Sequence, residues 1–213
     1  IGESTYTQYD RRIADASVKW IEEHATQDGW VLFSSFVAPH FPLIAPEEFA
    51  SRYRLQDIPL PKLHRAQDRV DHPWITALRT CFPHDIHFDD DLRRRALLSY
   101  AGLCSFMDWN FQRICDAIEE AGLAEEALVI YTSDHGDNMG ARALWGKSTL
   151  YEEAARVPML VRAPGQNLRK VVATQATLVA VDGSQIIPDR HVATQFGLIN
   201  VGAIIMKLNS GEA

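Results

Sequence analysis

The stretch that decides the fold is DDLRRRALLSYAGLCSFMDWNFQRICDAIEEAGLAEEALVIYTS, residues 90–133. Between Asp91 and Ala121 its apolar residues recur every three or four positions, which is typical of one face of an amphipathic helix. Negative charge at residues 89–91 suits the start of that helix, and Gly122 suits its end. The apolar run from Ala127 to Ser133 then predicts a buried strand.

The same alternation extends outward on both sides of this unit. Residues 7–24 have a helical pattern, and residues 30–39 form an apolar run typical of a strand covered on both faces. Residues 157–164 predict another strand. Strand, helix and strand alternate, so we expect an α/β fold with a largely parallel central sheet flanked by helices.

The remaining segments have weaker patterns. Prolines and charges are scattered over residues 47–91, so regular structure should be short there. Beyond residue 165, KVVATQATLVAV and GAIIMKL could be strands or a short helix.

Composition limits the classes of partner. The 213 residues are 46% hydrophobic and 23% charged, which is ordinary for one globular domain or most of one. A net charge of -7 without a sustained basic run argues against nucleic acid, and no apolar run approaches the roughly 20 residues that span a bilayer. We therefore expect neither a nucleic-acid nor a membrane partner, while the oligomeric state stays open.

The cysteines and the first residue bear on the compartment. Cys81, Cys104 and Cys115 cannot all pair within one chain, and they fit a reducing compartment or core packing, with a lean towards the cytoplasm. The chain begins at Ile1, so we expect a segment upstream of it. The absence of a signal peptide therefore carries no information, and localisation stays unknown.

Candidate chemistry follows two predicted strands. In an open α/β sheet, ligands collect beyond the carboxyl ends of the strands. Asp134 and His135 follow one strand and His40 follows another. An aspartate oxygen and an imidazole nitrogen can share a divalent cation, although two ligands are too few for a complete site. The alternative is that Asp134 caps a turn and His135 is a solvated loop residue.

The neighbourhood of these residues resembles a known family. SDHGDNMGARALWGKSTLYEEAARVPMLVRAPG, residues 133–165, is similar to the sulfatases of the alkaline-phosphatase superfamily, which carry Leu-Trp-Gly-Lys and Tyr-Glu-Glu after the acidic strand end. SFVAPHFPLIAPEEF, residues 35–49, resembles the Pro-His-x-Pro signature of the same family. The resemblance implies that residues 1–165 form part of an alkaline-phosphatase-like sulfatase catalytic domain, with residues 166–213 a divergent segment.

The resemblance also implies roles for particular side chains. Asp134 and His135 match metal ligands, the divalent ion being Ca²⁺ or alternatively Mn²⁺. Lys147 matches the lysine that holds the sulfate, and His40 matches a histidine that contacts the sulfate and protonates or orients the leaving oxygen. Arg142 occupies a position from which a substrate contact is possible, or at which an arginine is simply solvated.

The chain also departs from the family pattern. Sulfatases use a formylglycine made within Cys/Ser-x-Pro/Ala-x-Arg, and no such segment occurs here. Cys81 in CFPHD has Asp85 where the arginine would stand, so we reject it as the nucleophile. We expect the formylglycine and the first metal-binding acidic pair on a segment outside this chain, and we expect this chain alone to be inactive.

Three functions remain open at this point. The first is a metal-dependent sulfatase acting on a small sulfate ester. The second is a phosphonate monoester or phosphodiester hydrolase on the same scaffold, and the third is an inactive homologue or fragment that binds an anionic ligand or a partner chain. The segment CFPHDIHFDDD, residues 81–91, is interpreted as a charged loop and helix start rather than as a second metal site.

Overall fold

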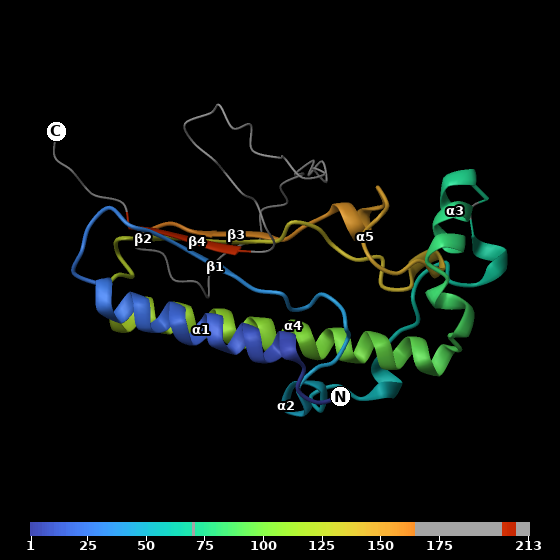
Figure 1. The fold of residues 1–213 in the computed structure, drawn as a ribbon, viewed down its shortest axis with the longest axis horizontal. Helices are drawn as coiled ribbons and strands as arrows, with labels where there is room; N and C mark the ends of the chain where they lie inside the picture. The colour runs from blue at the N-terminus through green and yellow to red at the C-terminus, as the bar shows by residue number, and fades with distance from the viewer. Residues whose placement is uncertain (70, 165–201, 208–213) are drawn as a thin grey trace.

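Two long helices lie side by side against one face of a small sheet (Figure 1). The computed structural model describes residues 1–69, 71–164 and 202–207. The helices are α1, Thr5–His24, and α4, Asp90–Glu120. The strands are β1, Val31–Ser35; β2, Ala127–Thr132; β3, Met159–Arg162; and β4, Gly202–Lys207.

Both long helices begin where a side chain satisfies the free backbone amides of the first turn. The Ser4 hydroxyl accepts a hydrogen bond from the Thr7 amide at 3.1 Å, and the Asp89 carboxylate accepts one from the Leu92 amide at 2.7 Å. Helix α4 ends before Gly122, whose φ of 74° lies in the left-handed region that glycine adopts readily. The helix predicted for residues 91–121 and its two ends are therefore confirmed.

The sheet differs from the prediction of a largely parallel one. Its strand order is β1-β4-β2-β3, and all three pairings among the described strands are antiparallel. Strands β2 and β3 are joined by residues 133–158, which contain only short helical turns and return at the same edge of the sheet. A parallel connection would need a crossover, usually a helix, which this segment does not supply.

Coverage of the sheet also differs from the prediction. The core lies between the helices and the sheet, and it includes Ile21, Phe106, Ile114, Ile118 and Val129. On β1, however, Val31 is 59% exposed and Phe33 is 52% exposed. The prediction that this strand is covered on both faces is therefore wrong in the described structure.

The predicted surface excursion, residues 47–91, does contain only short elements. They are α2, Glu47–Ala50; the 3₁₀ turns η1, Leu55–Asp57, η2, Ala66–Asp68, and η3, His84–His87; and α3, Pro73–Cys81. Two more, η4 (Ala141–Ala143) and α5 (Glu152–Ala155), follow β2. In the described part of the chain, no helix combines the length and apolarity that a bilayer crossing requires.

The segment after residue 164 is described only in part. The predicted element KVVATQATLVAV lies outside the described residues, whereas GAIIMKL contains strand β4. The division at residue 165 stays a prediction, although β4 joins the same sheet as the strands before it.

Candidate active site

Two loops that are far apart in sequence meet at one edge of the sheet. Strands β1 and β2 both pair antiparallel with β4, so they point in the same direction and their carboxyl ends share an edge (Figure 1). The loop after β1 carries His40 and the loop after β2 carries His135, and the centroids of these two rings lie 5.9 Å apart. The two loops in which candidate chemistry was expected therefore lie next to each other.

Lys147 joins these histidines. Its Nζ lies 2.8 Å from Nε2 of His135, and Nδ1 of His135 lies 2.6 Å from the carbonyl oxygen of Gly136. A carbonyl can only accept, so Nδ1 carries the proton and Nε2 accepts from the ammonium of Lys147. The pair thus consists of a neutral imidazole and a cation.

Asp134 lies behind this pair. Its Oδ2 is 3.6 Å from Nε2 of His135, while its Oδ1 is buried and has no hydrogen-bond partner among the described residues. A buried carboxylate oxygen without a donor is costly, and a bound cation would satisfy it. The donor set therefore fits part of a divalent site. The described residues contain no group of three or more His, Cys, Asp or Glu side chains placed to complete such a site.

A cavity of about 890 Å³ opens in front of these polar groups. His40, His135 and Lys147 line it, whereas Asp134 is not among its lining residues. Another part of its wall is largely apolar and consists of Leu43, Leu78, Phe82, Phe88, Leu144 and Trp145. The cavity can thus hold an anionic group at its polar end and an apolar group beside it.

Comparison with known proteins places this arrangement in a family. Residues 2–186 match the family Sulfatase. The chain belongs to the sulfatase family. It is 28% identical over 137 residues to the choline-sulfatase of Rhizobium meliloti, which covers 64% of this chain and 27% of that protein. It is 25% identical over 170 residues to the iduronate 2-sulfatase of Mus musculus, covering 74% of this chain and 31% of that one.

A solved structure supports the same placement. The phosphonate monoester hydrolase from Silicibacter pomeroyi superimposes with a TM-score of 0.64 at 26% identity, over 73% of this chain and 33% of that one. These comparisons show an alkaline-phosphatase-like hydrolase fold. This sulfatase chain spans about a third or less of the length of these relatives.

Within the sulfatase chain, Asp137 and Asn138 fix the position of the Lys147 loop. Oδ1 of Asp137 accepts from the amides of Met139, at 2.8 Å, and Gly146, at 3.0 Å. The side-chain amide of Asn138 donates to the carbonyl of Gly146 at 2.6 Å. The turn that these hydrogen bonds hold brings Lys147 back to His135.

Gly136 lets the Asp134–His135 loop approach the Tyr-Glu-Glu segment. Its amide donates to the carbonyl of Ala154 at 2.8 Å, and a Cβ at this position would lie 2.1 Å from the carbonyl oxygen of Glu153. No side chain can be accommodated at that distance. The glycine of the Asp-His-Gly motif is therefore required by close backbone contact.

The carboxylate of Glu153 holds the neighbouring segments together. It pairs with Lys62 and, at 3.0 Å, with Nη1 of Arg142. Burial alone would raise the pKa of Glu153, but hydrogen bonds from Lys62, from its own backbone amide and from Arg142 together outweigh it and lower that pKa below its ordinary value. Glu153 is thus an ionised anchor for the loop beside it.

Arg142 lies apart from the other predicted site residues. Its guanidinium pairs with Glu153, stacks over the ring of Tyr151 at 3.9 Å from the centroid, and does not line the large cavity. The arginine is therefore not a freely solvated one. The structure brings His40, Asp134, His135 and Lys147 together without Arg142, whose contact with substrate stays a prediction.

Asp10 positions the loop that carries His40, and the sequence pattern did not identify it. Its two carboxylate oxygens accept from the amides of Val37 and Ala38, each at 2.8 Å, and its side chain is fully buried. Burial raises the pKa of Asp10 and outweighs the opposing effect of these two hydrogen bonds. The only available signal was a charged residue on the buried face of a predicted helix.

Two further histidines were also missed. His84 and His87 line the large cavity together with His40 and His135, although their segment was interpreted as a charged loop and helix start. The helix-start part of that interpretation is confirmed by Asp89. The spacing of the two histidines in a short segment was the signal that could have placed them in the site.

Proposed function

We propose that this chain supplies the sulfate-binding part of the active site of a metal-dependent hydrolase that cleaves small sulfate esters. One observation carries the proposal: His40, His135 and Lys147, which are separated by up to 107 positions in the sequence, line one cavity. Membership of the sulfatase family supports the reaction class. The alcohol released and the identity of the metal belong to the proposal as well.

Each side chain suits the charges of this reaction. A sulfate ester carries negative charge on its outer oxygens and develops more on the leaving oxygen during cleavage. The ammonium of Lys147 offsets charge on the sulfate, and His40 can orient or protonate the leaving oxygen. Both groups lie at the polar end of the cavity, which leaves the apolar wall for the rest of the substrate.

Asp134 and His135 would hold the divalent cation, for which Ca²⁺ is our first choice and Mn²⁺ the second. When bound, the cation supplies electrostatic stabilisation to sulfate oxygens. The lone pair of His135 Nε2 can serve either Lys147 or a cation, but not both. In the cation-bound form, the ammonium of Lys147 is therefore free for the substrate.

A second candidate function has a specific observation behind it. The phosphonate monoester hydrolase from Silicibacter pomeroyi shares the fold at 26% identity. Phosphoryl and sulfuryl groups are both tetrahedral oxyanions with similar electrostatic needs. The residues in the cavity suit either group.

A substrate panel on the full-length protein tests these functions. Aryl sulfates, choline sulfate, sugar sulfates and phosphonate monoesters are compared at equal concentration, with and without a chelator that removes divalent cations. We expect chelator-sensitive turnover, highest with a sulfate ester. Highest turnover of a phosphonate would transfer the proposal to the second function, and no turnover of any ester would support an inactive homologue.

Calcium binding gives a readout that does not depend on turnover. Titration calorimetry with Ca²⁺ and with Mn²⁺ compares the full-length protein with its Asp134→Asn variant. We expect the variant to bind at least about tenfold more weakly, because a metal site needs its anionic oxygen ligands. Equal affinity would remove Asp134 from the metal site.

A further inference from the structure

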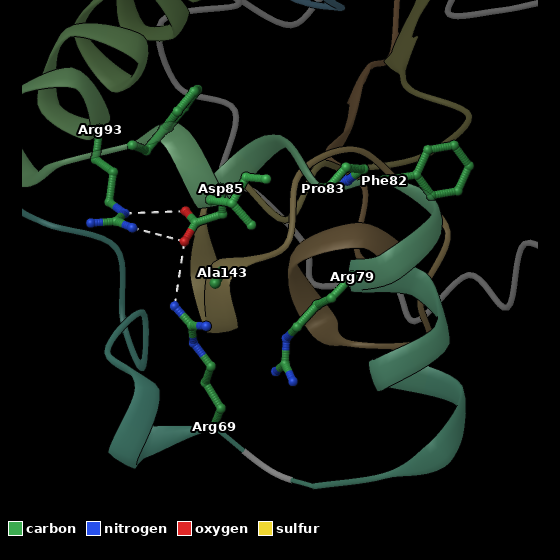
Figure 2. A pocket seen from close by; sticks show the side chains of 9 residues that line it. Arg69, Arg79, Phe82, Pro83, Asp85, Arg93 and Ala143 are labelled. Carbon is green, nitrogen blue, oxygen red and sulfur yellow. Dashed lines mark hydrogen bonds and ion pairs between the residues drawn. The ribbon is translucent and has the colours of Figure 1, made fainter.

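A second cavity of about 250 Å³ adjoins the large one. Phe82, Pro83 and Phe88 line both cavities, so these residues form a common wall along which the two cavities adjoin. The rest of the smaller cavity is strongly charged. Its lining contains three arginines, Arg69, Arg79 and Arg93, around a single carboxylate (Figure 2).

That carboxylate, Asp85, is already fully engaged. Arg93 donates to its two oxygens at 3.1 and 2.7 Å, and Arg69 adds a longer contact at 3.4 Å, as the dashed lines in Figure 2 show. Nε1 of Trp145 donates to it at 3.2 Å. Four donors therefore share the two oxygens of Asp85, and Arg93 pairs with Asp90 as well, at 3.1 Å.

Arg79 has no such partner. It makes no ion pair with any residue in the described ranges, and its only hydrogen bonds there run from Nε and Nη2 to the carbonyl of Arg142 at 3.3 and 3.2 Å. Within the part of the chain that the structure describes, Nη1 of Arg79 and Nη1 of Arg69 donate no hydrogen bond. An arginine stays protonated at neutral pH, so Arg79 brings to the cavity a positive charge that has no ion-pair partner among the described residues, and both arginines offer a free donor.

The electrostatics agree with this geometry. Burial, and after it the charge of Arg69, lowers the pKa of Arg79. Figure 2 shows the side chains of Arg69 and Arg79 lining the same cavity, with a dashed line from Asp85 to Arg69 and none to Arg79. An oxyanion placed between them would relieve their repulsion and accept from donors that now have no partner.

We propose that Arg79 and Arg69 form a second oxyanion subsite, which binds a carboxylate or sulfate group carried on the leaving part of the substrate. The common wall of Phe82, Pro83 and Phe88 sets the intervening part of that substrate against an apolar surface. Assignment of the anion to the substrate rests on the proposed function, whereas anion binding at the arginines does not. The substrate class is thus a sulfate ester with a second negative group.

Arginine labelling tests the binding directly. The full-length protein carrying Lys147→Ala, which weakens the first sulfate site, is treated with phenylglyoxal with and without inorganic sulfate. Modified arginines are then identified by peptide mass spectrometry, with sodium chloride at matched ionic strength as the reference. We expect sulfate at ten times its Kd to slow labelling of Arg79 about tenfold, because only the unoccupied site reacts.

The exposed Arg65, which lines neither cavity, is the internal control and should be labelled at the same rate throughout. An Arg79→Gln variant should also lose the protection of Arg69. Labelling of Arg79 that does not respond to sulfate would overturn the proposal. Equal protection of Arg65 would overturn it as well, because it would mark a general ionic effect.

Kinetics then distinguish a substrate group from a free anion. Two aryl sulfates are compared that differ only in a second anionic group on the ring. For Arg79→Gln we expect the ratio of the KM of the dianion to that of the monoanion to rise about tenfold, the scale of one lost charge-assisted contact. Arg65→Gln should leave this ratio unchanged, and an unchanged ratio in Arg79→Gln would overturn the assignment to the substrate.

A free anion would give a different pattern. Added sulfate would then change the turnover of both esters equally, and this change would be absent in Arg79→Gln. That result would overturn the assignment of the anion to the substrate, but not anion binding at the arginines. Absence of turnover with every ester, together with protection of Arg79, would contradict the proposed function alone. Turnover without protection would contradict the second subsite alone.

Discussion

At the scale of single residues, the contact between Lys147 and His135 is the most direct link between structure and chemistry. Their nitrogen atoms lie 2.8 Å apart in a cavity that His40 also lines. The proposed function assigns the ammonium of Lys147 to the sulfate group of the substrate. The contact therefore defines the first variant to make.

In the full-length protein, we expect Lys147→Ala to lower kcat/KM by about 10²-fold or more, the scale of one preorganised electrostatic contact. The midpoint of thermal unfolding should be nearly unchanged. Lys147→Arg should recover only part of the activity, because a planar guanidinium does not reproduce the compact charge of an ammonium. Steady-state kinetics and thermal unfolding measure both effects. The exposed Lys19 gives the control variant Lys19→Ala. Near-normal kinetics in Lys147→Ala would contradict the assigned role.

Gly136 provides a second test at this scale. We expect Gly136→Ala to destabilise the protein by about 1–3 kcal/mol, the usual cost of overpacking, since its Cβ would lie 2.1 Å from the carbonyl oxygen of Glu153. Activity should fall as well, because the displaced loop carries Asp134 and His135. Urea unfolding and kinetics provide the two measurements.

The matched control is Gly122→Ala. Gly122 has a positive φ, unlike Gly136, but a Cβ there meets nothing within 4 Å, and the residue lies at the end of α4. We expect this variant to lose stability without losing turnover. If both glycine variants kept full activity, the close contact at Gly136 would not be what positions the site.

At the scale of elements, α1 controls the loop after β1 through Asp10. Burial raises the pKa of this carboxyl, so the folded state binds a proton more tightly than the unfolded state does. The quantity of interest is the free energy of unfolding of the wild type minus that of Asp10→Asn. This difference should be greatest below the ordinary aspartate pKa of about 4. It should then fall as pH rises through the raised folded pKa.

Urea unfolding at a series of pH values measures this difference. The control is Asp15→Asn, because Asp15 lies on the same helix but has an exposed side chain. The difference in unfolding free energy between the wild type and this variant should not fall as pH rises. A difference that grows with pH would show that the hydrogen bonds from Val37 and Ala38 dominate instead.

Glu153 in α5 should behave in the opposite way. Because its pKa is lowered in the folded state, its stabilising contribution is present above the ordinary glutamate pKa of about 4.3 and is lost as pH falls through the folded pKa. Glu153→Gln should therefore be less stable than the wild type at neutral pH and should approach it in acid. The exposed neighbour allows Glu152→Gln as a matched control, which should show neither effect.

The sequence predicted helices well where the local pattern of apolar and capping residues determines them. The 3.6-residue period and the capping residues located α4 to within a residue, because amphipathic burial and capping are encoded locally. Strand direction was not predictable, because an apolar run does not reveal which partner lies beside it. The residues of the site came from motif resemblance, whereas Asp10, His84 and His87 depend on tertiary contacts that no short pattern contains.

At the scale of the whole molecule, β4 holds the two halves of the site in register. It lies between β1 and β2 and pairs with both. We expect the backbone amides of residues 203–206 to exchange with deuterium as slowly as those of β2, because both edges of β4 are paired. Hydrogen exchange followed by mass spectrometry measures this. Fast exchange in β4 beside slow exchange in β2 would contradict the strand order.

The position of β4 also has a consequence for synthesis on the ribosome. His40, Asp134, His135 and Lys147 all leave the exit tunnel before residues 202–207, yet β1 and β2 are not neighbours in the sheet without that late strand. Pairing over such long sequence separation is slow, because the entropy of loop closure must be overcome first. A nascent chain halted before Gly202 would hold His40, Asp134, His135 and Lys147 and still lack the strand that brings their two loops together.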